Sequence, residues 1–295
     1  MKVIILGKDD MLANLIRGSI LADVDIVGVL RYENLYFSGF QMLLNDTFKP
    51  SPALTLIKKY NLNDMKFNSA NSEEFKKEVL RLNTDIILVG TWSEKLDKEI
   101  IELPKIATIN VHPSMLPKYR GPNPYLQTIW HGEKFSGVTF HLMTENFDSG
   151  AVLAQARIEI LKIDTGKELR NKTVFCARLL CTELLNDLKK GCVVPIPQDE
   201  RAATYYKEIS PEDMTLNFEK ETADEIMAHV RGFYPFRPTY IQDGNKFLIV
   251  NPYKMSLTDK IAQPAEITTR KTKTIEIACK DGRVLRFEDL KRYRK

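Results

Sequence analysis

The amino-terminal half of the chain alternates short apolar runs with amphipathic stretches, and this pattern restricts the fold more than any other feature of the sequence. The apolar runs predict buried strands at residues 2–7, 24–30, 85–90 and 106–111. The amphipathic stretches predict helices at residues 11–21, 51–60 and 72–82, the last with Ser72 as its N-cap. Strands that alternate with helices predict an α/β fold built on a parallel sheet.

The second half of the chain begins with a long helical stretch at residues 164–190. An apolar stripe along this helix predicts a face packed into the core, and its members are Leu179, Leu180, Leu184 and Leu185. Gly191 ends the helix. Residues 191–206, which include Pro195 and Pro197, predict a linker that crosses the surface.

The carboxy-terminal part of the chain predicts a second, smaller domain. Residues 223–231 predict a helix, and from residue 239 onward short apolar runs alternate with turn signals such as Asp243-Gly244 and Asp281-Gly282. That alternation is typical of a small antiparallel barrel. We therefore expect a first domain over residues 1–190, a linker over residues 191–206 and a second domain over residues 207–295.

The first strand predicts no dinucleotide site. Gly7 is followed by Lys-Asp-Asp-Met-Leu, so the glycine-rich turn that holds a pyrophosphate is missing and a nicotinamide cofactor is not expected. In open parallel sheets, ligands bind beyond the carboxyl ends of the strands. Here that edge brings residues 90–92 together with residues 110–114, and we expect the binding site there.

Three polar residues are candidates for chemistry at this edge of the predicted sheet. Asn110 and His112 lie two residues apart at the end of a predicted strand, so both side chains face the same way. An amide and a protonated imidazole aimed together can stabilise the negative charge that develops when an amine attacks a carbonyl carbon, each donor contributing about 3 kcal/mol. Asp148, in the turn Glu-Asn-Phe-Asp-Ser-Gly, is the candidate carboxylate that holds the ring charged and removes the amine proton through a water. Alternatively, His112 is a packed turn histidine and Asp148 an Asx-turn residue.

The loop after the trio is rich in residues of fixed or unusual backbone torsion, which predicts one rigid shape: Leu116, Pro117, Tyr119, Arg120, Gly121 and Pro122. Arg120 either contacts an anionic part of a substrate or pairs with a carboxylate and fixes the loop. His131 and His141 lie in neighbouring segments, His141 turned into the structure, and neither is expected to serve the chemistry.

Composition is that of an ordinary globular protein, with 43% hydrophobic and 28% charged residues. The start of the chain lacks the hydrophobic region of a signal peptide or a membrane span, so we expect a cytoplasmic protein. Four cysteines without CxxC spacing predict reduced, mostly buried thiols and no metal site.

The net charge of +4 permits an anionic partner without requiring one. Basic residues gather at Arg270, Lys271 and Lys273 and in the tail around Tyr293, at Lys291, Arg292, Arg294 and Lys295. These residues form either a surface for phosphates and stacked bases or a solvated tail that keeps the protein soluble.

Three motifs in order resemble the N10-formyltetrahydrofolate-dependent formyltransferases. They are N-x-H-P-S-x-L-P-x-Y-R-G-P at residues 110–122, SGVTFHLM at residues 136–143 and D-x-G at residues 148–150. The sequence KYRGPNP at residues 118–124 is similar to the corresponding sequence in the methionyl-tRNA and amino-sugar branches of the family. Residues 204–241 are similar to the segment that leads into the small carboxy-terminal domain of both branches, so the resemblance covers most of the chain.

The resemblance implies a Rossmann-like catalytic domain followed by an oligonucleotide-binding-like barrel, with Asn110, His112 and Asp148 as the catalytic trio. The reaction it implies moves a formyl group from 10-formyltetrahydrofolate, the co-substrate, to a primary amine through a tetrahedral intermediate, without a metal or NAD. The folate would lie against Gly90, Thr91, Trp92, Ser114, Leu116 and Pro117, and the amine substrate against Tyr119, Arg120 and Gly121. Thr91 and Trp92 stand where the family usually has tyrosine or phenylalanine, and Trp92 either stacks on the pterin or caps the core.

The identity of the amine remains open between two acceptors. The methionyl-tRNA branch usually carries a basic loop after its second strand that holds the acceptor stem, whereas residues 31–47 here are aromatic and contain one arginine. Chain length, the barrel and the basic tail favour initiator tRNA, which we prefer. The missing basic loop and the aromatics Tyr32, Tyr36, Phe37 and Phe40 favour a nucleotide-linked amino sugar. A non-catalytic nucleic-acid-binding module is a third reading, and the intact trio argues against it.

Overall fold

The computed structural model describes residues 1–35, 46 and 50–293, and these form two compact units. The amino-terminal unit contains residues 1–120, 137–158 and 172–205, and the carboxy-terminal unit contains residues 121–136, 159–171 and 206–295. Two segments that lie within the first domain expected from the sequence, residues 121–136 and 159–171, therefore cluster with the second unit.

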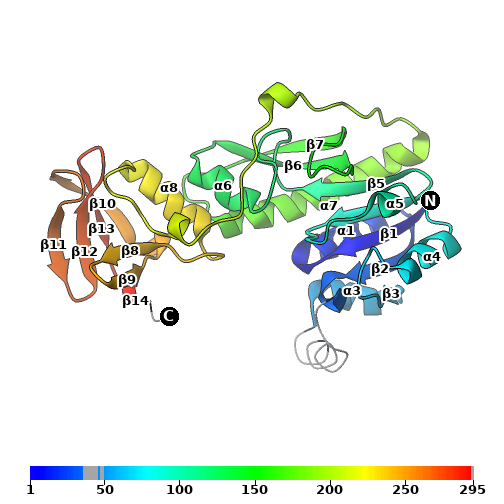
Figure 1. Ribbon diagram of the computed structural model, residues 1–295, viewed down its shortest axis with the longest axis horizontal. Coiled ribbons are helices and arrows are strands. Elements are labelled where there is room, and N and C mark those ends of the chain that lie inside the picture. The colour runs from blue at the N-terminus through cyan, green and yellow to red at the C-terminus, as the bar shows by residue number, and fades with distance from the viewer. Residues whose placement is uncertain (36–45, 47–49, 294–295) are drawn as a thin grey trace. The chain divides into compact units, whose positions relative to one another are not determined.

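The amino-terminal unit is built on a seven-stranded sheet with the order β3-β2-β1-β4-β5-β6-β7 (Figure 1). Its strands are β1 (Lys2–Gly7), β2 (Asp25–Arg31), β3 (Asp64–Met65), β4 (Ile86–Gly90), β5 (Ala107–His112), β6 (Phe135–Leu142) and β7 (Val152–Glu159). The pairs from β3 through β5 are parallel, whereas β5 and β6 are antiparallel. The predicted α/β fold with a mostly parallel sheet is confirmed.

Helices cover both faces of this sheet because its central strands are apolar on both sides. The helices are α1 (Asp9–Leu21), α3 (Pro52–Lys59), α4 (Glu73–Arg81), α5 (Lys98–Ile101) and α7 (Gly166–Lys190). Val3 and Ile5 of β1 pack in one core cluster with α1, α3 and α7, and the alternate residues Ile4 and Leu6 pack in another with α4 and α5. Ser72 caps α4 as predicted, its side chain accepting from the Phe75 backbone N–H at 3.2 Å.

One residue of the predicted apolar stripe on α7 lies outside the core. Leu180, Leu184 and Leu185 are buried, whereas Leu179 is 46% exposed. The reason is geometric: at 3.6 residues per turn, positions 180, 184 and the neighbouring 181 and 177 share the buried face, and position 179 is rotated away from it.

The carboxyl ends of β1 and β4 approach closely because glycines end both strands. Gly7 pairs with Gly90, and a Cβ on Gly7 would come within 2.4 Å of the Gly90 carbonyl oxygen. A Cβ on Gly90 would meet the Leu15 side chain at 2.7 Å. Glycine at these positions thus lets α1 pack directly over the edge where ligands bind in such sheets.

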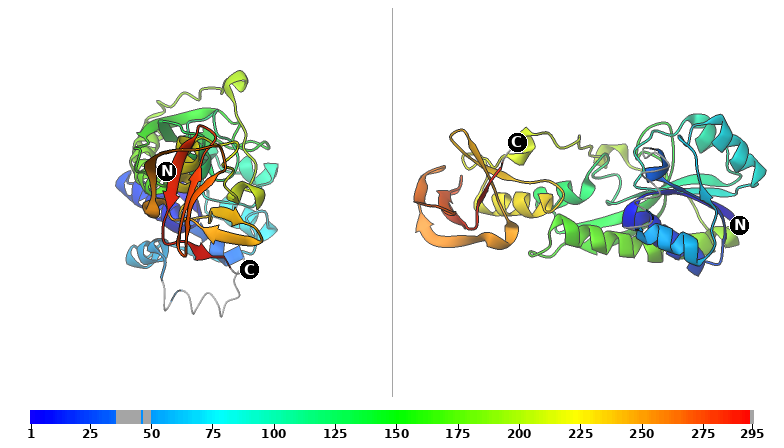
Figure 2. Two further views of the ribbon diagram at one scale, coloured as in Figure 1. Left: turned by 90° about the vertical axis from the view of Figure 1, so that its left-hand side faces the viewer. Right: turned by 90° about the horizontal axis from the view of Figure 1, so that it is seen from below.

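Within the described residues, the carboxy-terminal unit contains helices and two antiparallel sheets, and its later part is coloured yellow to red in Figure 2. The helices α6 (Pro124–Trp130) and α8 (Ala223–Phe233) pack through Leu126, Trp130 and Phe233. The four-stranded sheet contains β10 (Met255–Ile261), β13 (Arg283–Phe287), β12 (Thr274–Ala278) and β11 (Ile267–Lys271), and the three-stranded sheet contains β14 (Lys291–Arg292), β9 (Lys246–Ile249) and β8 (Tyr240–Asp243).

Tight turns connect these strands where the sequence predicts them. Gly244 and Gly282 adopt positive φ values of 57° and 77° in the β8–β9 and β12–β13 hairpins, a conformation that glycine enters without steric cost. Ile226, Ile277 and Phe287 lie in one apolar core shared by α8 and the strands. The predicted small antiparallel domain is confirmed.

Within the described residues, no helix is long and apolar enough to cross a membrane, and no group of three or more histidine, cysteine or acidic side chains is arranged to hold a metal ion.

Candidate active site

Asn110 and His112 occupy the end of β5, beside the end of β4. The parallel register pairs Gly90 with Val111, so the loop after β4 and the two polar side chains of β5 meet at the same edge of the sheet, as predicted. His112 is 4% exposed and Asn110 is half-buried. The alternation of β5 points both side chains to one face.

Asp148 joins them from the loop between β6 and β7. Its Oδ1 lies 3.4 Å from Nδ2 of Asn110 and 3.3 Å from Nδ1 of His112. The side chain of Asp148 is 11% exposed. The three residues that the sequence singled out therefore converge on one carboxylate oxygen.

The imidazole of His112 has an acceptor on each side. Nδ1 faces the Asp148 carboxylate, and Nε2 lies 2.7 Å from the backbone carbonyl oxygen of Tyr119. A neutral ring carries one N–H and can donate to one of these acceptors, whereas the doubly protonated ring donates to both. Two loops, one bearing Asp148 and one bearing Tyr119, thus define the orientation of the ring.

His141 is a site residue for which the sequence predicts no part in the chemistry. It is 2% exposed, as expected of a residue turned into the structure, but its Nε2 lies 3.1 Å from Asn110 Nδ2 and 3.7 Å from Asp148 Oδ1. The Leu142 carbonyl lies 2.9 Å from Nδ1, which therefore carries the proton and leaves Nε2 to accept from Asn110. The sequence alone could not place His141 beside Asn110. The two residues are opposite each other only because β6 pairs with β5 in antiparallel register.

The backbone at both loops is in a strained conformation. Tyr119 has a φ of 61° and Asp148 a φ of 55°, in the left-handed region that costs a non-glycine residue about 1 kcal/mol or more. Aspartate tolerates this region better than tyrosine does. Such residues persist where surrounding contacts fix them, and both loops contact His112.

The predicted folate-binding residues at the end of β4 differ in burial. Gly90 is buried against α1, and Thr91 is exposed with a φ of 58°. Trp92 packs partly into the core and meets the ring of Tyr32 edge-on at 5.0 Å. Its buried Nε1 has no hydrogen-bond partner among the residues that the structure describes, so a donor is left over at this edge.

The predicted folate-binding residues after β5 take part in hydrogen bonds that hold their own loop in place. Ser114 is fully buried, and its Oγ donates to the Lys118 carbonyl at 2.7 Å. Leu116 is buried, and its carbonyl accepts from the Gln155 amide at 2.9 Å. Pro117 is half-buried, and its carbonyl accepts from the Thr204 backbone N–H at 3.2 Å.

Among the predicted substrate residues, Tyr119 and Arg120 have buried side chains, and Gly121 is half-buried with a φ of 97°. Arg120 pairs with a carboxylate, which was one of its two predicted alternatives. Its Nη1 and Nη2 contact the Glu200 carboxylate at 2.8 and 2.7 Å. Hydrogen bonding to Glu200 outweighs the effect of burial and raises the pKa of Arg120.

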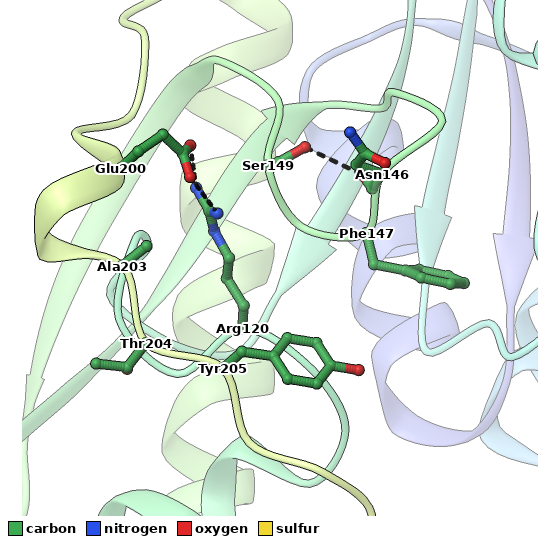
Figure 3. Close-up of a pocket in the computed structure, with 8 residues that line it drawn as sticks. All are labelled: Arg120, Asn146, Phe147, Ser149, Glu200, Ala203, Thr204 and Tyr205. Carbon is green, nitrogen blue, oxygen red and sulfur yellow. Dashed lines mark hydrogen bonds and ion pairs between the residues drawn. The ribbon is translucent and has the colours of Figure 1, made fainter.

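A cavity of about 450 Å³ opens between the loop of Arg120 and the loop between β6 and β7 (Figure 3). Asn146, Phe147 and Ser149, which flank Asp148 in sequence, form one wall, and Arg120 with the segment from Glu200 to Tyr205 forms the other. Phe147 is 58% and Tyr205 is 61% exposed. The cavity is thus lined by polar side chains and by two aromatic rings that are exposed to solvent.

The segment predicted as a surface linker, residues 191–206, is a structural part of this site. It contains the short 3-10 helix Glu200–Ala202 and no longer element, which agrees with its prolines. Its side chains nevertheless bind the loops of Arg120 and Asp148. A high proline content predicts irregular backbone but does not predict which side-chain contacts that segment makes.

Residues 31–47 are only partly described. Arg31 is 2% exposed and binds the carboxylates of Asp46 and Asp64 at 2.9 and 2.8 Å. Burial disfavours its charge, but the hydrogen bonds with Asp46 and Asp64 outweigh it and raise the pKa of Arg31. Its guanidinium is therefore engaged within the protein. Of the aromatics expected to stack, Tyr32 contacts Trp92, and Tyr36, Phe37 and Phe40 lie outside the described residues.

Two family models match this chain: Formyl transferase over residues 1–193 and Formyl transferase, C-terminal domain over residues 208–295. The methionyl-tRNA formyltransferase of Enterococcus faecalis is 34% identical over 82% of this chain and 77% of its own length. That of Staphylococcus aureus is 26% identical over 98% and 91%.

A solved N-formyltransferase from Helicobacter canadensis, in complex with folinic acid and dTDP-3-aminofucose, has the same fold. Its TM-score is 0.71 at 17% identity, over 99% of this chain and all of that one. The two family models together with the Enterococcus faecalis relative establish that the chain belongs to the formyl transferase family.

Proposed function

We propose that this formyltransferase moves the formyl group of 10-formyltetrahydrofolate to a primary amine, with Asn110, His112 and Asp148 as its catalytic residues. One observation carries the proposal: Asp148 Oδ1 lies within 3.4 Å of Asn110 Nδ2 and within 3.3 Å of His112 Nδ1. The amide, the imidazole and the carboxylate are thus held within reach of one another, and the amide and ring N–H groups are donors of the kind that stabilise an oxyanion.

The proposed reaction proceeds in two steps. The amine nitrogen forms a bond with the formyl carbon, whose carbonyl electrons move onto oxygen to give a tetrahedral oxyanion stabilised by Asn110 and His112. Asp148 accepts the proton that the attacking amine loses, directly or through a water. The oxyanion then collapses and breaks the bond to the folate N10, which takes up a proton. Holding amine and formyl carbon in attack geometry contributes roughly 7 kcal/mol or more.

The folate is proposed to lie against the loop after β4 and the loop after β5, at Gly90, Thr91, Trp92, Ser114, Leu116 and Pro117. Nε1 of Trp92, which has no hydrogen-bond partner among the described residues, supports this position, because a pterin ring offers nitrogen and oxygen acceptors to such a donor. The Helicobacter canadensis protein of the same fold holds folinic acid, a reduced folate, which further supports a folate co-substrate.

We propose methionyl initiator tRNA as the acceptor. The relatives named methionyl-tRNA formyltransferase align with up to 98% of this chain, including the carboxy-terminal unit. That unit carries exposed cations suited to phosphates: Lys254, Lys271, Lys273, Lys291 and Arg292. Arg294 and Lys295 of the predicted basic tail lie outside the described residues.

A nucleotide-linked amino sugar is the second candidate, and the cavity between Arg120 and Phe147 favours it. Phe147 and Tyr205 offer uncovered rings there, on which a base or sugar can stack. The engagement of Arg31 by Asp46 and Asp64 favours it as well, because the only arginine of the region that corresponds to the basic loop is then not free for a tRNA phosphate.

The deciding experiment incubates the protein with 10-formyltetrahydrofolate and either methionyl initiator tRNA or a panel of nucleotide-linked amino sugars, and measures tetrahydrofolate release and formylated product. The Asp148→Ala variant serves as the matched blank. Formylated tRNA at catalytic rates supports the first acceptor, and a formylated sugar supports the second. Failure to formylate any primary amine, from a protein that binds the folate, would remove the proposal.

A further inference from the structure

Residues 196–205, here called the strap segment, bind both loops that surround His112. Ile196 exchanges two backbone hydrogen bonds of 2.8 Å with Val152, which follows the Asp148 loop. At the other end, Thr204 accepts from the Tyr119 backbone N–H through its Oγ1 and from the Arg120 backbone N–H through its carbonyl, both at 2.9 Å. The strap segment therefore spans the gap between the two loops.

Gln198, in the middle of the strap segment, joins the loops with one side-chain amide. Its Nε2 donates to the carbonyl oxygens of Asp148 and Gly150 at 2.8 and 2.7 Å. Its Oε1 accepts from Nε and Nη2 of Arg120 at 3.2 and 2.8 Å. An amide has two N–H donors and two acceptor lone pairs, so this side chain uses its full capacity.

The two loops joined by Gln198 carry the two acceptors of His112. The Asp148 loop supplies the carboxylate that faces Nδ1, and the Tyr119–Arg120 loop supplies the carbonyl that faces Nε2. Tyr119 and Asp148 both have positive φ, so neither loop is in a relaxed conformation on its own. External hydrogen bonds are needed to keep such backbone in place, and Gln198 and Thr204 provide them.

We propose that Gln198 is a positioning residue for the formyl transfer proposed above, on which the inference rests. It keeps the Asp148 carboxylate and the Tyr119 carbonyl on opposite sides of the imidazole, and it acts through these groups without touching substrate. Because the requirement is two donors on one side and two acceptors on the other, an amide is the side chain that meets it.

This requirement predicts which substitutions fail. In Gln198→Glu, the carboxylate still accepts from Arg120 but faces two carbonyl oxygens that need donors, so the Asp148 loop loses its hydrogen bonds. In Gln198→Met, similar length is kept and all four hydrogen bonds are lost. Asp199→Asn is the matched control, since Asp199 lies next to Gln198 and its side chain hydrogen-bonds only to the exposed Arg201 in the described structure.

The experiment measures kcat and KM for the acceptor that the wild-type protein formylates. Because a misplacement of about 1 Å in a reacting group can cost about a hundredfold in rate, both Gln198 variants should lose roughly ten- to a hundredfold in kcat with KM nearly unchanged. Asp199→Asn should keep the wild-type kcat. A Gln198→Met variant that folds and turns over at the wild-type rate would overturn the inference.

A double-mutant cycle tests whether Gln198 acts through Asp148. In an Asp148→Ala background, Gln198→Met should lower kcat by a clearly smaller factor than in the wild-type background, because one of the two groups it positions is already absent. Full additivity of the two losses would contradict the inference.

A crystal structure of Gln198→Glu provides a readout that needs no activity. The distance from Asp148 Oδ1 to His112 Nδ1 should exceed hydrogen-bonding range, and an unchanged Asp148 loop would overturn the inference. Should the wild-type protein formylate no amine, the proposed function fails, and the structure of the variant still decides whether Gln198 holds the loop.

Discussion

Nδ1 of His112 lies 3.3 Å from Oδ1 of Asp148, although the two residues come from different segments, the end of β5 and the loop between β6 and β7. The side chains are 6% and 11% exposed, so little water competes for the contact. Charge interactions in such a setting are stronger than at the surface. The pair is therefore suited to hold charge in place while a reaction proceeds beside it.

Replacing either member should slow turnover strongly while leaving the fold intact. Asp148→Ala and His112→Ala should each lower kcat by about a hundredfold or more, because each removes a group that stabilises or deprotonates the reacting centre. Formyl transfer measured by tetrahydrofolate release checks this, with circular dichroism as the test of folding. His131→Asn, a change at a histidine outside the cluster, should retain wild-type turnover. Near-wild-type rates in Asp148→Ala would exclude the proposed mechanism.

His141 should contribute to the rate through Asn110. Its Nε2 is the acceptor for one N–H of the Asn110 amide at 3.1 Å, so His141→Leu leaves that half-buried N–H unpaired and the amide less firmly oriented. A hydrogen bond of about 1.4 kcal/mol corresponds to a tenfold change in rate, and we expect kcat to fall by about that factor. In an Asn110→Ala background the same substitution should have little effect. Equal losses in both backgrounds would contradict a role through Asn110.

The sequence predicted what depends on local pattern. The order of strands and helices follows from apolar period, and the shared face of Asn110 and His112 follows from the alternation of one strand. Asp148 was a candidate from its polar turn and then from the family resemblance, and aspartate is among the residues that tolerate the positive φ it adopts there. Hairpins at Asp243-Gly244 and Asp281-Gly282 follow from turn chemistry.

Contacts between distant segments could not be predicted in this way. Placing His141 beside Asn110 requires knowing that β6 pairs with β5 in antiparallel register. Assigning Gln198 a role requires knowing that an irregular segment folds back over two loops, for which no periodic signal exists. For Arg120 the sequence left two alternatives, a contact with the substrate or a pair with a carboxylate. The Glu200 carboxylate, 2.7 Å from its guanidinium, supports the second.

The four cysteines should differ sharply in reactivity. Cys192 is exposed, Cys176 is half-buried, and Cys181 and Cys279 are buried. Burial raises the pKa of Cys181 and of Cys279 to about 12, and burial together with Glu183 raises the pKa of Cys176, so few thiolates form at these three positions near neutral pH. Labelling of the native protein with an aromatic disulfide at pH 8 should therefore show one fast thiol per chain. Cys192→Ser should abolish that fast phase, and its persistence would show that another cysteine is accessible.

The carboxy-terminal unit should lose stability in acid through Glu276. This side chain is 2% exposed on the four-stranded sheet, and its carboxylate accepts from Lys260 at 2.6 Å, Thr269 at 2.7 Å and Arg286 at 2.7 Å. Hydrogen bonds from Lys260, Thr269 and Arg286 lower the pKa of Glu276 from 4.5 to about 2. The unfolded chain therefore binds the proton first as pH falls.

It follows from this difference that the stabilisation is fully present above about pH 4.5 and is lost as pH falls toward 2. Glu276→Gln removes it at all pH values. In scanning calorimetry of the full chain, the variant should melt below the wild-type protein at pH 7, and the gap should narrow between pH 4.5 and 2. Glu288→Gln, at an exposed position on the neighbouring turn, is the matched control and should leave the melting curve unchanged. A constant gap across this range would show that the Glu276 carboxylate is not the titrating group.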